Sequence, residues 1–136
     1  MKRKKGNKKV RNATTKVYKG IKFRSKLELF TYIKLEEAGI KALYEKKKFT
    51  LMEGFYFDAI SIEPSTRAET RGQFLENEYK VRDITYTNDF VDPNGKWIIE
   101  VKGYANDTFP MKWKMFKNML QNSEEDIPIL YLPKNH

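Results

Sequence analysis

A chain of 136 residues is the size of one domain and is long enough to bury roughly two-thirds of its unfolded surface in a core. It has no cysteine and a single histidine, His136, which excludes disulfides, thiolate metal sites and histidine-based catalysis. Any chemistry must therefore use carboxylates, amines, hydroxyls or a hard metal ion. No apolar run approaches the length of a membrane span, so we expect a soluble, intracellular, cytoplasmic protein without a membrane partner.

The net charge of +9 comes from the front of the chain. Residues 1–26 hold twelve Lys or Arg and no acid, whereas the remaining residues hold fifteen bases against eighteen acids. We expect residues 1–16 to be a flexible, basic N-terminal arm that binds the phosphates of a nucleic acid, followed by a single domain over residues 17–136. A solubilising tail or an anchor for an acidic membrane surface is the alternative. The candidate DNA-binding residues in the arm are Lys2, Arg3, Lys4, Lys5, Lys8, Lys9 and Arg11.

The first regular element after the arm is a short strand or extended segment over residues 17–23. A helix is predicted from about residue 26 to 38, with Ser25 as its N-cap and Gly39 as its C-terminal stop. From Leu43 the period shortens to that of strands, and a turn at Glu53-Gly54 predicts a hairpin between "FTLM" and "FYFDAISI".

The polar segment at residues 63–73 predicts an exposed loop. Strands are predicted over 79–91 and 96–102, followed by a helix capped by Thr108 and a buried final strand over 127–133. This order of elements predicts an α/β (α+β) fold, with a mixed central sheet flanked by helices. In the second helix Lys112, Lys114 and Lys117 are candidates to contact a phosphate backbone, with a solvated helix face as the alternative.

The segment "TNDFVDPNGKWIIEVKG" (87–103) predicts a tight hairpin. With "DPNG" as a four-residue loop, Val91 lies opposite Lys96, and Asp89 and Glu100 become diagonal neighbours on one face. That face also carries Lys102. The other face is apolar and faces the core, and its members are Ile84, Tyr86, Phe90, Trp97, Ile99 and Val101, with Asn88 as the polar exception.

Two carboxylates so close together repel each other and lose hydration unless a cation lies between them. Because the available ligands are oxygens, Mg²⁺ or Mn²⁺ is the expected cation, bound by Asp89, Glu100 and the main-chain carbonyl of Val101. Lys102 projects from the same face and can hold an attacking water or offset charge on a phosphate. The alternative is a half-exposed strand whose acids and lysine are structural.

These residues resemble the signature of the PD-(D/E)xK (restriction-endonuclease-like) nuclease superfamily, an acid followed by (D/E)-x-K at the end of the next strand. Here the acid is Asp89 and the second half is "EVK", while the proline lies at position 93, so the "PD" half is not literal. In chain order "GIKFRSKLELFTYIKLEEAGI", "KFTL", "VRDITYTNDFV" and "IIEVKG" are similar to small phage and prophage proteins of this fold, including the phage endonuclease I-type Holliday junction resolvases.

The resemblance implies a restriction-endonuclease-like fold and a Mg²⁺-dependent endodeoxyribonuclease that leaves a 5′-phosphate, in a host cytoplasm if phage-encoded. It also implies that Glu28 completes the catalytic and metal-binding set of Asp89, Glu100 and Lys102. From the residues alone, Ser25-x-x-Glu28 is equally a capping box.

We therefore expect a metal-dependent DNA endonuclease, with branched DNA such as a recombination junction as the preferred substrate and a homodimer suited to a twofold junction. The rivals are a non-catalytic nucleic-acid-binding protein, and a nuclease that acts nonspecifically on DNA or on RNA.

Overall fold

The computed structural model describes residues 15–101 and 108–133. Its strands are β1 Lys16–Tyr18, β2 Ile21–Phe23, β3 Leu43–Tyr44, β4 Lys48–Met52, β5 Ile62–Pro64, β6 Phe74–Glu76, β7 Ile84–Thr87, β8 Phe90–Val91, β9 Trp97–Ile99 and β10 Ile129–Tyr131. Its helices are α1 Lys26–Glu37, the 3-10 turn η1 Ala68–Thr70, and α2 Phe109–Gln121. No helix within these two ranges is both long and apolar enough to cross a membrane.

Helix α1 begins and ends where the sequence predicts. Oγ of Ser25 accepts a hydrogen bond from the backbone N–H of Glu28 at 3.2 Å, which satisfies one of the free donors of the first turn. At the other end Gly39 has φ of 72°, and the N–H groups of Gly39 and Ile40 donate to the carbonyls of Glu36 and Leu35. This is a Schellman motif, which needs a residue that adopts positive φ at little cost.

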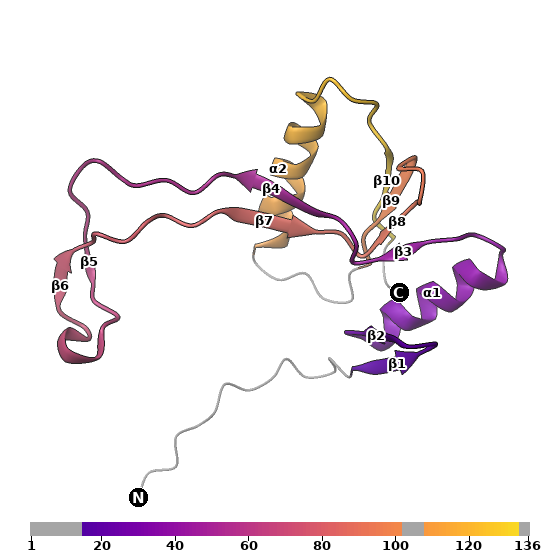
Figure 1. Ribbon diagram of the computed structural model, residues 1–136, viewed down its shortest axis with the longest axis horizontal. Helices are drawn as coiled ribbons and strands as arrows, with labels where there is room; N and C mark the ends of the chain where they lie inside the picture. Colours follow the sequence, from indigo (N-terminus) through magenta and orange to yellow (C-terminus); the bar gives the residue numbers. More distant parts are fainter. Residues whose placement is uncertain (1–14, 102–107, 134–136) are drawn as a thin grey trace, which may run out of the picture.

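The central sheet has the strand order β10-β9-β8-β3, in which β10 runs parallel to β9 and the other pairs are antiparallel. Helix α1 lies on one face, where Phe23, Tyr44, Phe90 and Val101 form a buried cluster against its apolar side chains. Helix α2 covers another cluster, which contains Tyr86, Val91 and Ile98. The predicted mixed sheet flanked by helices is therefore present (Figure 1).

Helix α2 packs through the stripe that its sequence predicts. Phe109, Trp113, Phe116 and Leu120, at intervals of four, three and four, are its buried residues. Pro110 lies in the first turn, where its missing N–H costs nothing, but the side chain of Thr108 makes no capping hydrogen bond.

The β8–β9 hairpin forms where the sequence predicts it, but its strands pair in a different register. Val91 pairs with Ile98 rather than with Lys96, because Asp92 opens a longer turn. The side chain of Asp92 accepts the N–H of Lys96 at 3.1 Å, and its carbonyl accepts the N–H of Gly95 at 2.8 Å. The acid therefore serves as the cap of this loop, and the pairing moves by two residues.

The predicted separation of the hairpin into one core face and one site face is wrong. Phe90 packs in the cluster under α1, whereas Tyr86 packs with Val91 under α2, although the predicted continuous strand places Tyr86 and Phe90 on one face. The chain leaves the strand conformation at Asn88 and Asp89, between β7 and β8, and this break changes which face each side chain occupies. Because helices cover both faces of the sheet, both sets of side chains are buried.

Three other predicted elements differ from the structure. Strand β4 pairs with β7, with Phe49 opposite Tyr86, instead of forming a hairpin with the segment after Gly54. The predicted long strand over 79–91 is divided into β7 and β8. The last strand, β10, is an edge strand whose Ile129 is 61% exposed, so it is not buried as predicted.

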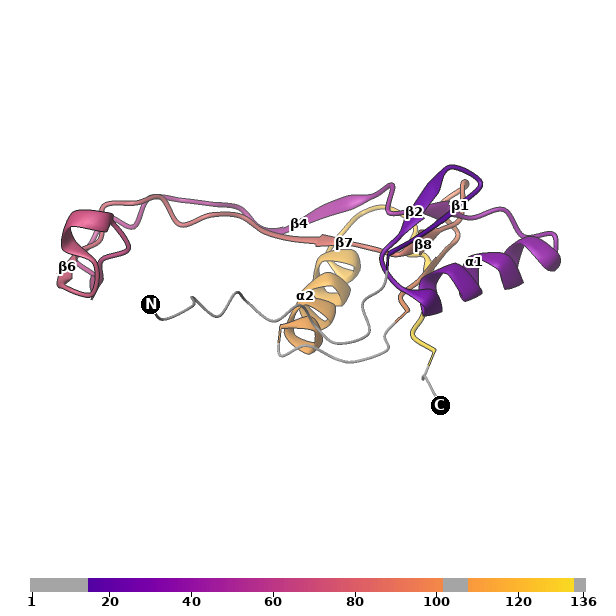
Figure 2. The ribbon, with the colours of Figure 1, turned by 90° about the horizontal axis from the view of Figure 1, so that it is seen from below.

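Residues 53–83, here called the extension, leave the sheet between β4 and β7 and return to it. An isolated bridge between Phe55 and Val81 continues the two-stranded pairing, and β5 and β6 form the hairpin at the far end. Figures 1 and 2 both show the extension projecting away from the two helices and the central sheet as two adjacent chain segments, with β5 and β6 at the far end. Residues 63–73, predicted as an exposed loop, include its tip.

Candidate metal centre

The candidate site lies where three strands come together at the break in the chain. Tyr44 pairs with Phe90, and Phe90 pairs with Ile99. When these registers are continued by one residue, Glu45, Asp89 and Glu100 form a row of acids across neighbouring strands. The backbone N–H of Glu45 donates to the carbonyl of Asp89 at 2.9 Å, which fixes the first two members of this row side by side.

Asp89 is the centre of the row and is only 7% exposed. Its Oδ2 accepts a 2.7 Å hydrogen bond from the backbone N–H of Val101, so the carboxylate is held against the strand that carries Glu100. A charge-assisted hydrogen bond of this kind fixes one carboxylate oxygen. Val101 thus contacts Asp89 through its N–H, and the metal-binding role predicted for the carbonyl of Val101 stays a prediction.

Glu28 reaches the same place from the first turn of α1. Its carboxylate accepts hydrogen bonds from the hydroxyl of Tyr44 and, at 3.3 Å, from the backbone N–H of Arg24. Burial raises the pKa of the Glu28 carboxyl above its usual range, and these two hydrogen bonds oppose part of the rise. Glu28 therefore does not close the capping box that the sequence allows, because its carboxylate accepts the N–H of Arg24 rather than that of Ser25; only the Ser25 half of the box, the bond from the N–H of Glu28 to Oγ, is formed.

Glu28, Glu45 and Asp89 form one cluster of carboxylates. One oxygen from each lies within 4.8 Å of the others, and Asp89 is buried while the two glutamates are half-buried. Among the described residues, Arg24 forms a salt bridge to the cluster: its Nε lies 3.0 Å from Oε1 of Glu45, and its side chain is 77% exposed. Three carboxylates at this separation repel one another strongly in a partly desolvated site, and a hard divalent cation would relieve that repulsion.

Glu100 is buried beside this cluster but is not one of the three. It is 2% exposed, and its Oε2 accepts hydrogen bonds from the hydroxyl of Tyr86 at 2.6 Å and from the N–H of Asp89 at 3.3 Å. Burial raises the pKa of Tyr86, with the charge of Glu100 as the next cause, so the hydroxyl stays a donor. The predicted metal role of Glu100 stays a prediction.

Glu45 is the site residue that the sequence analysis missed. It follows the short strand β3 and has φ of 48°, a left-handed conformation that is uncommon outside glycine. Nothing in the segment "LYEKKK" marks a ligand. Only the pairing of β3 with β8, between residues far apart in the sequence, brings it to Asp89.

Asn88, next to Asp89, is fully buried, and neither its Oδ1 nor its Nδ2 has a hydrogen-bond partner within the described part of the chain. Buried amides normally bond to protein or to ordered water. This side chain therefore has capacity for a further polar partner beside the candidate centre.

The other predicted residues are not brought to the cluster by the described structure. Lys112, Lys114 and Lys117 lie on α2, with Lys114 and Lys117 exposed and Nζ of Lys117 5.8 Å from the centre of the Trp113 ring. Lys102 and the candidate residues of the N-terminal arm, Lys2, Arg3, Lys4, Lys5, Lys8, Lys9 and Arg11, lie outside the described residues.

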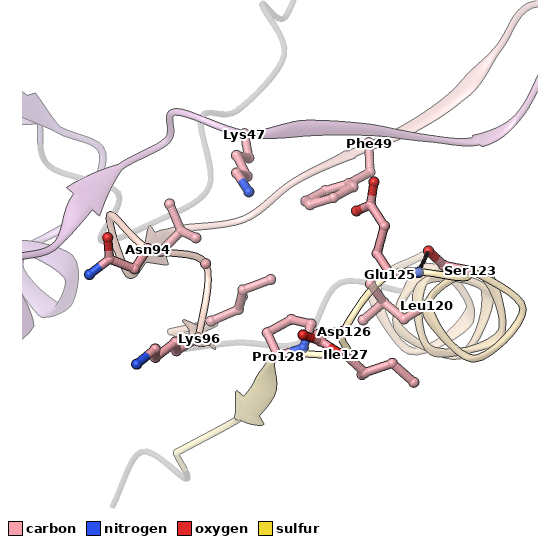
Figure 3. Close-up of a pocket in the computed structure, with 13 residues that line it drawn as sticks. Lys47, Phe49, Asn94, Lys96, Leu120, Ser123, Glu125, Asp126, Ile127 and Pro128 are labelled. Atoms are coloured by element: carbon pink, nitrogen blue, oxygen red, sulfur yellow. Dashed lines mark hydrogen bonds between the residues drawn. The ribbon is translucent and has the colours of Figure 1, made fainter.

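A hollow of about 500 Å³ opens elsewhere, between the β8–β9 turn and the C-terminal end of α2 (Figure 3). Lys47 and Lys96 line it together with Glu125 and Asp126, so its charges are mixed. None of the carboxylates of the candidate centre lines this hollow. The candidate centre is therefore distinct from it.

Comparison of the chain with models of protein families, with curated proteins and with solved structures gave no match.

Proposed function

We propose that the protein is a metal-dependent DNA endonuclease with a restriction-endonuclease-like fold. The observation that carries the proposal is the convergence of Glu28 in α1, Glu45 just after β3 and Asp89 just before β8, with one oxygen of each within 4.8 Å of the others. Carboxylate oxygens are the ligands that Mg²⁺ and Mn²⁺ prefer, and the set contains no imidazole or thiolate that would favour zinc or copper. The donor set therefore fits the metal that the sequence resemblance implies.

Each residue has a distinct role in this proposal. Asp89 binds the cation through its carboxylate, which the N–H of Val101 holds in place, and Glu28 and Glu45 complete the carboxylate set. Tyr44 orients Glu28, as partners of metal ligands commonly do. Glu100 fixes the backbone of Asp89 and is available as a further ligand if its hydrogen bond to Tyr86 is released.

A bound divalent cation would lower the pKa of a coordinated water and stabilise charge on the phosphate. Lys102, one residue after Val101, would hold the attacking water. Addition of hydroxide to the phosphorus and breakage of the bond to the 3′ oxygen leave a 5′-phosphate and a 3′-hydroxyl. Branched DNA is the proposed substrate, and two copies of the chain would suit a twofold junction.

The basic front of the chain supports a nucleic-acid substrate. Residues 1–26 contain twelve bases and no acid, and a cluster of this kind gains affinity by releasing counterions from phosphates. Such binding reads no base sequence, so we propose that selectivity comes from the shape of the DNA.

The testing experiment incubates the full chain with four-way, nicked and linear DNA in Mg²⁺ and in EDTA. The variants Asp89→Asn and Lys102→Ala should bind DNA as the wild type does but no longer cut it. A matched control is Glu124→Gln, an exposed acid after α2 that is not in the cluster. Cleavage that is unchanged in Asp89→Asn would overturn the proposal.

One observation favours a second candidate, a non-catalytic nucleic-acid-binding protein. The charge of Arg24 balances that of Glu45, and the neutral hydroxyl of Tyr44 donates a hydrogen bond to Glu28, so two of the three carboxylates already have partners within the protein. For that function the wild type binds DNA and cuts neither DNA nor RNA in Mg²⁺ or Mn²⁺. A matched RNA junction in the same assay identifies an RNA nuclease.

A further inference from the structure

The amide of Asn88 is buried without any partner from the polypeptide. Its side chain is fully buried, and neither Oδ1 nor Nδ2 makes a hydrogen bond. Within residues 15–101 and 108–133, no other residue has buried side-chain nitrogen or oxygen atoms in this state. An amide can accept two hydrogen bonds and donate two, so burying it unpaired costs free energy. Such a group indicates a polar partner from outside the polypeptide.

The backbone opposite Asn88 contains a β-bulge. The N–H of Glu45 donates to the carbonyl of Asp89, whereas Lys48 already pairs with Thr87. Two residues on this side of the ladder therefore oppose Asn88 alone. A bulge interrupts the ladder and redirects side chains, and bulges are common beside active sites. The amide thus lies at an interruption in the strand pairing rather than inside a continuous sheet.

The neighbours of Asn88 are the acids of the candidate centre. Asp89 follows it directly and belongs to the carboxylate cluster, and the buried Glu100 accepts the N–H of Asp89 at 3.3 Å. The nuclease signature that this segment resembles has a proline directly before its acid, and a proline side chain neither donates nor accepts hydrogen bonds. The amide is therefore a feature of this chain and not of the signature.

The chemistry of the centre identifies the partner. DNA cannot touch a side chain that has no exposed surface. The cluster already offers three carboxylates, and Mg²⁺ usually completes its octahedral shell with water molecules that it releases reluctantly. The hydrogens of such a water point away from the ion and need acceptors. Oδ1 of Asn88 is an acceptor beside the cluster, and Nδ2 is a donor that suits a carboxylate oxygen.

We propose that Asn88 is a positioning residue of the metal centre: its Oδ1 accepts a hydrogen bond from a water molecule bound to the cation, and its Nδ2 donates to a carboxylate oxygen of the cluster. The amide then costs stability in the metal-free protein and is satisfied when the ion and its water bind. This inference rests on the proposed metal centre and adds to it a residue that acts through water.

Replacing the amide separates a positioning role from a structural one. The Kd for Mn²⁺, measured by calorimetry, should rise at least tenfold in Asn88→Leu, which keeps the branched shape, and in Asn88→Ala, which cannot overcrowd the site. In EDTA, at least one of the two variants should unfold in urea at or above the wild-type midpoint, because an unsatisfied amide is removed. The matched control is Asn118→Leu, an exposed amide on α2, whose Kd should equal that of the wild type.

A second measurement leaves the sequence intact. In the ¹⁵N-labelled wild type, the side-chain NH₂ signals of Asn88 should shift when Mg²⁺ is added, while those of Asn118 should not. A wild type that binds no Mn²⁺ would overturn the metal centre and this inference with it. If the wild type binds Mn²⁺, an unchanged Kd in either folded variant, midpoints in EDTA below the wild type in both, or an unshifted Asn88 amide would overturn this inference alone.

Discussion

The backbone N–H of Val101 donates a 2.7 Å hydrogen bond to Oδ2 of Asp89, across the hairpin that joins β8 to β9. Val101 is the residue between Glu100 and Lys102, so this bond ties the E-x-K segment to the acid that precedes it by twelve positions. The same acid is joined through its carbonyl to the N–H of Glu45. Asp89 is therefore the residue through which the strands of the candidate centre are connected.

The first prediction compares Glu45 with Glu100 as metal ligands. Glu45→Gln removes a charge from the cluster of three carboxylates, so the affinity for Mn²⁺ should fall about 10- to 100-fold. Glu100→Gln should have a smaller effect, because a glutamine oxygen still accepts the bond from Tyr86. Isothermal titration calorimetry measures both. A larger loss in Glu100→Gln would place the ion between Asp89 and Glu100, as the sequence alone predicts.

The sequence predicts this site in part, and the reason lies in how each residue is positioned. Asp89 and Glu100 lie on the two sides of one hairpin, and the residues of its turn are recognisable in the sequence. Their proximity therefore follows from local pairing, even though the predicted loop was too short. The site role of Glu28 was implied only by the family resemblance, since the residues around the start of α1 predicted a capping box equally well. Glu45 is brought to Asp89 by pairing between β3 and β8, and local patterns carry no information about such a contact.

In the fold, too, the features set by neighbouring residues were predicted, whereas a pairing between distant segments was not. The boundaries of α1 follow from Ser25 and Gly39, and the buried stripe of α2 follows from its spacing, because both are set within a few residues. The pairing of β4 with β7 was missed because Glu53-Gly54 looks like a hairpin turn. In the structure the chain runs on through the extension and returns to β7 at Ile84, opposite Met52.

The second prediction concerns the pKa of Glu28. Because burial raises this pKa, the folded protein binds a proton there more tightly than the unfolded chain does. Without metal, the contribution of Glu28 to stability should therefore fall as pH rises from the unfolded pKa through the raised folded pKa. Glu28→Gln removes this charge and keeps an acceptor for Tyr44, so its stability relative to wild type should increase over that window.

Urea unfolding in EDTA at several pH values measures this difference, with Glu37→Gln, an exposed acid at the end of α1, as the control. Saturating Mn²⁺ should reverse the order of stability, since the ion binds the folded wild type more tightly. A difference that is constant with pH would show that the charge of Glu28 is not destabilising.

The third prediction tests the cluster under α2. Phe116 is fully buried, and its ring centre lies 4.8 Å from those of both Phe49 and Tyr86. Phe116→Ala should lower the free energy of unfolding by about 3–5 kcal/mol, through lost burial and the cavity that remains. Met111→Ala on the same helix, where the side chain is 54% exposed, should change it by less than about 0.5 kcal/mol. Chemical denaturation distinguishes the two, and equal losses would contradict the packing described.

The fourth prediction concerns the base of the extension. A β-carbon added at Gly54 would lie 2.6 Å from the carbonyl oxygen of Val81 and 2.8 Å from Oδ1 of Asp83, so Gly54→Ala must open the pairing there. Amide exchange at Phe55 and Val81, which bond to each other's carbonyls, should accelerate while exchange in α2 stays unchanged. Asp83→Ala, which removes one bond without a clash, should give a smaller acceleration. Unchanged exchange in Gly54→Ala would contradict this geometry.

The fifth prediction concerns the basic front of the chain. Removing residues 1–14 takes away seven bases and no acid. If these bases bind phosphates, the plot of log K against log[salt] for duplex DNA should become shallower by up to about 6, at roughly 0.9 per phosphate contact. Fluorescence anisotropy at several salt concentrations measures the slope. Metal affinity serves as the control and should not change, because the candidate ligands all lie after residue 27. A slope equal to that of the full chain would show that these bases make no contact with the DNA backbone, and the electrostatic support for a nucleic-acid substrate would then be lost.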